Sequence, residues 1–233
     1  DLTIIDGSEA KSGKISFKDT SAGDPSFGWG SYTISNYGGT LVVKNGTIEH
    51  LGEQNTATEV KHMICAIYQY SGSTTINGGT INNICNFTLA IDNLGTTTIK
   101  GGTFTSVHTT IGNHSTMTID GGSFTCNGLD GITAHALIAW GGSETTINGG
   151  TFDGKDNYNG FNIDAVSGAV VNINGGEFLK AHSGSLYGNG TINVMGGFYF
   201  DDPTARVATG YHTIKINDTL YTVMKYRDNA YII

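Results

Sequence analysis

The chain has 233 residues, of which 35 are Gly and only 2 are Pro, and its formal net charge is −8. Glycine is about twice as frequent as in average soluble domains but does not recur at every third position, which excludes a collagen-like chain, and no apolar stretch approaches the roughly 18 residues of a membrane span. With 12 basic against 20 acidic residues, nucleic acid is not expected as a partner, because binding phosphates requires clustered Lys and Arg.

The first 40 residues lack the pattern that organises the rest of the chain. Residues 6–32 are polar and rich in glycine, as irregular segments are. We expect residues 1–40 to form an irregular N-terminal coil or cap, residues 41–200 a series of regular coils, and residues 201–233 a C-terminal cap. Together these parts are expected to make one domain, 1–233.

An internal repeat built around a Gly-Gly pair occupies the centre of the chain. Its copies are 74–81, 97–104, 117–124, 145–152, 171–178 and 192–199, with a degenerate copy at 42–48. The spacing of the second glycine varies from 20 residues (Gly102 to Gly122) to 33 residues (Gly46 to Gly79). Such uneven insertions are typical of a solenoid whose loops differ in length, and not of a helical repeat with a fixed period.

Both flanks of each Gly-Gly pair alternate apolar and polar residues, which is the period of a β-strand. The glycines let the backbone bend between the two strands without a Cβ clash. A third strand is expected after each variable loop, at 89–91, 109–111, 137–139 and 163–165. This pattern predicts an all-β fold, a triangular parallel β-helix with three strands per coil and about eight coils.

The alternation also predicts three inward ladders. The first contains Ile76, Ile99, Ile119, Ile147, Ile173 and Val194; the second contains Ile81, Phe104, Phe124, Phe152, Phe178 and Tyr199; the third contains Ile91, Ile111, Ala139, Ala165 and Leu186. Asn77, Asn148 and Asn174 sit at the bend, where their side-chain amides are expected to pair along the stack. At about 4.8 Å per coil, the rod would be about 40 Å long.

The pattern changes after residue 203. Two alternating segments, 211–216 and 220–224, flank Asn217-Asp218-Thr219, which is typical of a hairpin turn. We expect this hairpin to cover the last coil, because the open strand edges of an uncovered coil would be a template for aggregation.

These repeats resemble the Gly-Gly-Thr-Phe coils of pectate-lyase-like right-handed parallel β-helices, which occur in surface proteins of gut Gram-positive bacteria and in phage tail proteins. The segment 196–211 is similar to the terminator of such arrays, and the resemblance covers roughly residues 33–225. It implies an extracellular place, on a cell surface or a virion, and leaves the oligomeric state open, with a trimer as one option. It indicates the fold and not the function, because this superfold hosts lyases, hydrolases, adhesins and phage tail proteins.

Two of the three outward faces carry rows of Thr. The first has Ser73/Thr75, Thr96/Thr98, Thr116/Thr118 and Glu144/Thr146, and the second has Thr80/Asn82, Thr103/Thr105, Ser123/Thr125 and Thr151/Asp153. A flat Thr-x-Thr array resembles ice-binding surfaces, yet Thr also suits any solvated strand. Because Glu144, Val170 and Glu177 interrupt the rows, we favour the solvated strand.

The third outward face is chemically varied and is the predicted ligand-binding face. Its candidate contacts are Trp140, Asp164, Asn162, Tyr187, His108 and, in the loop 153–161, Asp156 and Tyr158. An exposed indole beside acidic and amide side chains suits a sugar, whose ring packs on the indole while its hydroxyls form hydrogen bonds. The alternative is that Trp140 packs under the loop 126–136.

Glycosidase chemistry needs two carboxylates about 5–9 Å apart, and Asp164, Asp153 and Asp92 are the candidate catalytic acids if the chain is an enzyme. The lyases of the resembled fold combine clustered Asp, calcium and a basic Arg or Lys, and few basic residues occur in the central coils. Asp153 and Asp156 are candidates for a calcium site, since their loop offers oxygen ligands, although it lacks a terminal bidentate Glu. A solvated turn is the alternative.

These features favour a non-enzymatic surface or phage-tail module that binds a glycan or host-surface receptor. A polysaccharide-degrading hydrolase or lyase and a structural spacer are the alternatives. The long loops of the central coils favour binding over spacing, because a spacer does not need them. Cys65, Cys85 and Cys126 cannot all pair with one another and fit no metal-binding spacing, so we expect buried thiols and no cofactor beyond the candidate calcium.

Overall fold

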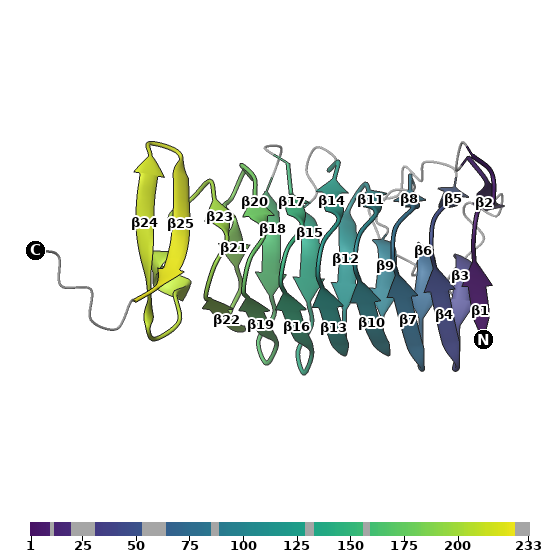
Figure 1. Ribbon diagram of the computed structural model, residues 1–233, viewed down its shortest axis with the longest axis horizontal. Helices are drawn as coiled ribbons and strands as arrows, with labels where there is room; N and C mark the ends of the chain where they lie inside the picture. Colours follow the sequence, from purple (N-terminus) through teal and green to yellow (C-terminus); the bar gives the residue numbers. More distant parts are fainter. Residues whose placement is uncertain are drawn as a thin grey trace, which may run out of the picture.

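The computed structural model describes residues 1–9, 12–19, 31–52, 64–84, 89–128, 133–155 and 159–226. Its strands form three sheets that run along a rod, with the strands of successive coils side by side (Figure 1). Neighbouring coil strands are parallel and lie three elements apart in the sequence. The predicted all-β parallel β-helix with three strands per coil is therefore confirmed.

We name the sheets A, B and C in the order in which the chain enters them. Sheet A contains β1 (Leu2–Ile4), β4 (Thr40–Val43), β7 (Ser73–Ile76), β10 (Thr96–Ile99), β13 (Thr116–Ile119), β16 (Glu144–Ile147), β19 (Val170–Ile173) and β22 (Thr191–Val194). Sheet B contains β2 (Lys14–Asp19), β5 (Thr47–Gly52), β8 (Thr80–Asn83), β11 (Thr103–Ser106), β14 (Ser123–Cys126), β17 (Thr151–Asp153), β20 (Glu177–Phe178), β23 (Phe198–Tyr199), β25 (Leu220–Lys225) and β24 (Tyr211–Asn217). Sheet C contains β3 (Ser31–Asn36), β6 (Ile64–Gln69), β9 (Leu89–Asn93), β12 (Thr109–Asn113), β15 (Ala134–Ala139), β18 (Gly160–Ala165) and β21 (Leu186–Tyr187).

The inward ladders of sheets A and B are the predicted ones. On sheet A, Ile76, Ile99 and Ile119 are in register and have no exposed surface. On sheet B, successive ring centroids are 4.6 to 5.1 Å apart along the column Phe104, Phe124, Phe152, Phe178 and Tyr199. Ring stacking adds to the hydrophobic gain of burying these side chains. The core is thus a column in which each coil repeats the contacts of the one before.

The Gly-Gly pair makes the corner between sheets A and B. The second glycine of each pair has a positive φ, for example +103° at Gly150. A Cβ there would lie 3.0 Å from the carbonyl oxygen of Gly122 in the preceding coil and 3.2 Å from the ring of Phe124. Only glycine fits, because the backbone conformation and the close approach of the two coils both exclude a side chain.

The predicted third ladder is wrong in its middle. The observed ladder of sheet C reads Ile67, Ile91, Ile111, Leu137, Ile163 and Leu186. The prediction places Ala139 and Ala165 in this ladder, but they lie in register with Asn113, two residues further along the strands. A slip of two residues keeps every side chain on its original face, so alternation alone does not distinguish the two alignments.

Side-chain amides form two ladders, one predicted in part and one missed. At the corner between sheets A and B, Asn174 donates to Asn148 and Asn148 donates to Asp120, each at 2.8 Å. Asn77 does not extend this ladder, because the next coil presents Lys100 at that position. The missed ladder lies inside the rod at the end of sheet C and contains the register-paired Asn36, Gln69, Asn93 and Asn113. Buried amides that bond to each other avoid the penalty of an unpaired polar group.

The two ends of the rod differ in construction. At the N-terminus, where an irregular cap was expected, β1, β2 and β3 pair in parallel with the strands of the next coil. At the C-terminus the predicted hairpin is confirmed: β24 and β25 extend sheet B in antiparallel fashion after β23 (Figure 1). Val223 is buried against the last coil, and the short helix η1 (Thr204–Arg206) precedes the hairpin. Among the described residues, no helix has the length and apolar character needed to cross a membrane.

Candidate functional site

The outward side of sheet C differs chemically from the outward sides of sheets A and B. Hydroxyl groups line sheets A and B, where Thr96 pairs with Thr116 and Thr103 with Ser123. Rings and acids line sheet C, and we call this surface the aromatic face. It comprises Tyr32, Tyr37, Tyr68, Tyr70, Asp92, His108, His114, His135, Trp140, Phe161, Asp164 and Tyr187, all on the strands of sheet C or next to them.

Two outward rows of these side chains follow from strand alternation and from the strand ends. One outward row, paired strand by strand, reads Tyr68, Asp92, Gly112, Ile138, Asp164 and Tyr187. Each member directly follows a residue of the inward ladder and so points to the opposite face. A second outward row begins one residue after the strands end, where the amides of His114 and Trp140 donate to the carbonyls of Asn93 and Asn113.

Trp140 and His114 form the centre of the aromatic face. Trp140 is 38% exposed, so its ring is accessible. The His114 ring stacks on it with centroids 5.4 Å apart and an interplanar angle of 12°. Because the imidazole stacks on one face of the indole, that face is not available to a ligand. Aromatic rings with polar edges suit sugars, which are apolar on one side and hydroxylated around the rim.

Asp92 lies against His114 and is completely buried. The next coil carries Gly112 in register with it, and a Cβ on that glycine would lie 2.4 Å from Leu89 Cδ2 and 3.0 Å from Asp92 Oδ1. Gly112 therefore leaves the space that the carboxylate fills. Within the described residues, neither carboxylate oxygen has an aligned hydrogen-bond partner, and Oδ1 lies 3.2 Å from His114 Nε2.

A second cluster lies toward the C-terminal end of the aromatic face. The ring of Tyr187 stacks on Phe161 at 4.2 Å, and Phe161 stacks on His135 at 5.8 Å. Burial lowers the pKa of His135 to about 4, and the charge of a protonated His108, whose own pKa is lowered by burial, adds to this shift. Burial raises the pKa of Asp164, whose Oδ2 lies 3.9 Å from His135 Nε2, too far for a hydrogen bond. His135 is therefore neutral at neutral pH and packs as an uncharged ring.

We expect His135 to make the folded protein less stable in acid. The unfolded chain protonates this imidazole near its ordinary pKa of 6.5, whereas the folded chain resists protonation down to about 4. Between these values the unfolded state binds more protons, so the free energy of unfolding should fall as the pH drops, by about 3 kcal/mol in all. Urea unfolding at about pH 7.5 and about pH 4 should show a smaller loss in His135→Phe than in the wild type. Identical acid dependence in the two proteins would contradict this prediction.

Four tyrosines occupy the N-terminal end of the aromatic face. Tyr32 and Tyr68 stack nearly parallel, with centroids 4.3 Å apart, and Tyr37 and Tyr70 lie beside them with centroids 5.4 Å apart. Burial raises the pKa of Tyr32 and Tyr68, so their phenols stay protonated. Each ring thus combines an apolar surface with a hydroxyl that donates and accepts hydrogen bonds.

The predicted ligand contacts divide into accessible and buried side chains. Exposed or partly exposed on the aromatic face are Trp140, Tyr187, Asp164 and His108. Asn162 was expected on the outward face, but its side chain is buried. Its Oδ1 accepts a hydrogen bond from the Gly154 amide at 2.7 Å, and its Nδ2 donates one to the Leu179 carbonyl at 2.6 Å. Both ends of this amide are therefore used inside the protein. Asp156 and Tyr158 lie outside the described residues.

Sequence reasoning missed three rings of the second outward row. Tyr37, Tyr70 and His114 each directly follow an amide residue at the end of a sheet C strand, in the pairs Asn36-Tyr37, Gln69-Tyr70 and Asn113-His114. The amide side chain points into the rod and the next side chain points out. An amide residue followed by an aromatic residue, repeated in successive coils, could therefore have predicted these outward rings.

Two of the candidate catalytic acids, Asp92 and Asp164, are too far apart for a glycosidase pair. Asp92 and Asp164 lie in the same outward row with two coils between them, and three steps of about 4.8 Å separate them by about 14 Å, beyond the roughly 5–9.5 Å required. Asp153 lies on sheet B, where its Oδ2 is paired with Lys155 Nζ at 2.6 Å. Across the described ranges, no three His, Cys, Asp or Glu side chains are grouped to hold a metal ion. The calcium site at Asp153 and Asp156 stays a prediction.

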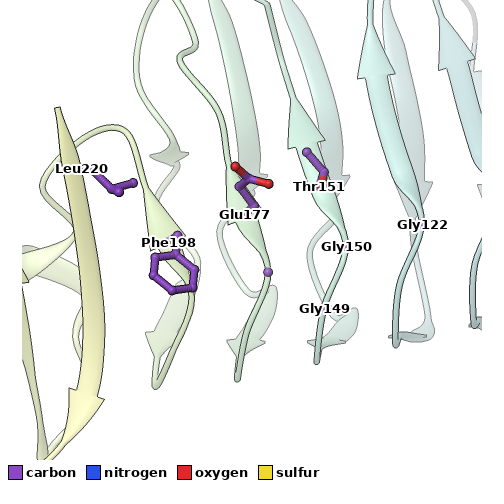
Figure 2. A pocket seen from close by; sticks show the side chains of 8 residues that line it. Gly122, Gly149, Gly150, Thr151, Glu177, Phe198 and Leu220 are labelled. Carbon is purple, nitrogen blue, oxygen red and sulfur yellow. The ribbon is translucent and has the colours of Figure 1, made fainter. Parts of the chain in front are cut away.

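A hollow lies on sheet B, next to the hairpin. Figure 2 shows it between Phe198 and Leu220 on one side and the corner glycines of earlier coils on the other, with Glu177 and Thr151 along it. Its volume is about 700 Å³, but the glycine corners contribute only main chain, and both polar side chains are at least partly exposed. We take the aromatic face as the candidate functional site instead, because stacked rings and buried titratable groups converge there.

The architecture by itself does not assign a function, because parallel β-helices host many unrelated ones. The chemistry of the aromatic face is the observation from which a function follows. Comparisons with protein-family models, with curated proteins and with solved structures found no match to this chain.

Proposed function

We propose that the chain is a non-enzymatic module that binds a glycan, or a glycan-bearing host receptor, on the aromatic face. The observation that carries this proposal is the row of accessible rings along one side of the coils: Tyr37, Tyr70, Trp140 and Tyr187 are all exposed next to sheet C. Exposed rings flanked by carboxyl, imidazole and phenol groups match the alternating apolar and hydroxyl surfaces of sugars. The outward sides of sheets A and B carry mainly hydroxyl rows, with Phe17 and Phe198 as separate exposed rings on sheet B rather than a set of neighbouring rings.

The Gly-Gly-Thr-Phe repeats are the second support for this proposal. They resemble the coils of pectate-lyase-like right-handed β-helices in surface proteins of gut Gram-positive bacteria and in phage tails. Because of this resemblance, we propose that the chain has an extracellular location, on a cell surface or a virion. The separation of about 14 Å between Asp92 and Asp164 favours binding over hydrolysis.

We expect Trp140→Ala to lower the affinity for any glycan found on an array by about tenfold or more, because central aromatic anchors dominate binding energies. Phe198→Ala is the matched control, since it removes an exposed ring from sheet B, and it should bind like the wild type. Product analysis of the bound glycan should return it intact.

Each other result would point elsewhere. Lost binding in Phe198→Ala with full binding in Trp140→Ala would move the site to the hollow beside the hairpin. Cleavage of the glycan would replace the binding module by a hydrolase or lyase. Full binding by both variants would contradict the aromatic face as the site.

A further inference from the structure

The carboxylate of Asp92 is buried without an aligned hydrogen bond. The side chain has no exposed surface, and within the described residues neither of its oxygens has a hydrogen-bond partner. Burying an ionised carboxylate is unfavourable unless another group compensates it. An unsatisfied group of this kind therefore calls for an explanation beyond packing.

The group that faces Asp92 is the imidazole of His114. Its Nε2 lies 3.2 Å from Asp92 Oδ1. A carboxylate only accepts hydrogen bonds, and two unprotonated atoms at this distance would repel each other. The proton of a neutral His114 therefore belongs on Nε2, which leaves Nδ1 as an acceptor.

His114 also stands at the accessible edge of the site. Its side chain is 33% exposed and its ring stacks on Trp140. The indole Nε1–H is a donor only. The two stacked rings thus offer one acceptor, Nδ1 of His114, and one donor, Nε1–H of Trp140. This combination matches hydroxyl groups, because each hydroxyl both donates and accepts hydrogen bonds.

We propose that Asp92 is a positioning residue, which holds the proton of His114 on Nε2 so that Nδ1 accepts a hydrogen bond from a hydroxyl of the glycan bound at Trp140. This inference rests on the proposed function and narrows its ligand to neutral sugars. The carboxylate of an acidic sugar would bring another acceptor to Nδ1, close to the buried charge of Asp92. None of the twelve side chains that define the aromatic face is Lys or Arg, the guanidinium of Arg206 at its C-terminal end is bonded to the Gly188 carbonyl, and the chain carries a net charge of −8.

Asp92→Asn tests this proposal, because it keeps the shape of the side chain and removes its charge. An amide both donates and accepts, so it no longer selects one tautomer. Long-range ¹H–¹⁵N spectra of the whole chain, recorded above the pH of imidazole titration, should show His114 with an unprotonated Nδ1 in the wild type and a mixture of tautomers in Asp92→Asn. The affinity for neutral glycans should fall about tenfold in the variant. The thermal midpoint should not fall, because a neutral isostere relieves the buried charge.

Asp218→Asn is the charge control, because this residue is fully exposed in the hairpin turn; it should change neither the tautomer, the affinity nor the midpoint. A wild-type spectrum with the proton on Nδ1, or with both nitrogens protonated, would overturn the assignment. So would an Asp92→Asn variant with the wild-type tautomer and affinity, or tighter binding of acidic than of neutral glycans. If no glycan binds at all, the proposed function fails, and the spectra still decide whether Asp92 orients His114.

Discussion

Replacing Phe124 by Ala is expected to lower the free energy of unfolding by about 4 kcal/mol. The ring of Phe124 has no exposed surface and is stacked between those of Phe104 and Phe152, at 4.8 and 4.9 Å. The smaller side chain removes buried apolar surface, leaves a cavity and breaks two ring contacts. Because each coil of a solenoid is held only by its neighbours, this cavity weakens the joint between the two halves of the rod.

Phe198→Ala is the matched control for this prediction. Phe198 also lies on sheet B, but it points outward and is 49% exposed, so its loss should change the free energy of unfolding by about 1 kcal/mol or less. Urea unfolding followed by circular dichroism measures both variants. A lower m value in Phe124→Ala would show that the halves unfold separately. Equal losses in the two variants would mean that the ring column is not the main source of stability.

Sheets A and B could be predicted residue by residue because a Gly-Gly corner joins their strands. The corner admits no side chain, so the alternation on either side shows which residues face the core, as with Ile119 and Phe124 around Gly122. Sheet C follows loops of variable length, and nothing local marks where its strands begin. For this reason Ala139 could take the place of Leu137 in the predicted ladder without any conflict in the pattern.

The candidate site could be predicted only for its exposed members. Trp140 stands out in the sequence as a large ring at an outward position. Its contact with His114 joins two coils across a loop, and so depends on a register that one sequence does not reveal. Strand alternation predicts that Asp92 is an exposed acid. The side chain is nevertheless buried, because the next coil has Gly112 at the neighbouring position and leaves room for the carboxylate. Local patterns predict which face a residue takes, whereas its accessibility depends on the neighbouring coil.

Replacing Asn113 by Ala is expected to lower the free energy of unfolding by about 4 kcal/mol. The Oδ1 of Asn113 accepts from Asn93 Nδ2 at 2.7 Å, and its Nδ2 donates to Thr145 Oγ1 at 2.8 Å. All three side chains are buried, so alanine leaves a donor and an acceptor unpaired inside the rod, at about 1–3 kcal/mol each. Since Asn113 directly precedes His114, loss of this anchor should also reduce the affinity for a glycan bound at Trp140.

Two further variants separate the lost hydrogen bonds from the change of side chain. Asn174→Ala removes an amide from the exposed corner ladder, where water replaces it, and should lower the free energy of unfolding by no more than about 0.5 kcal/mol. Adding Thr145→Val to Asn113→Ala removes the unpaired hydroxyl and should recover about 1 kcal/mol, which a simple packing defect would not do. If urea unfolding shows equal losses for Asn113→Ala and Asn174→Ala, the interior amides do not hold the end of sheet C. The position of the His114 ring would then have to come from its contacts with Asp92 and Trp140 alone.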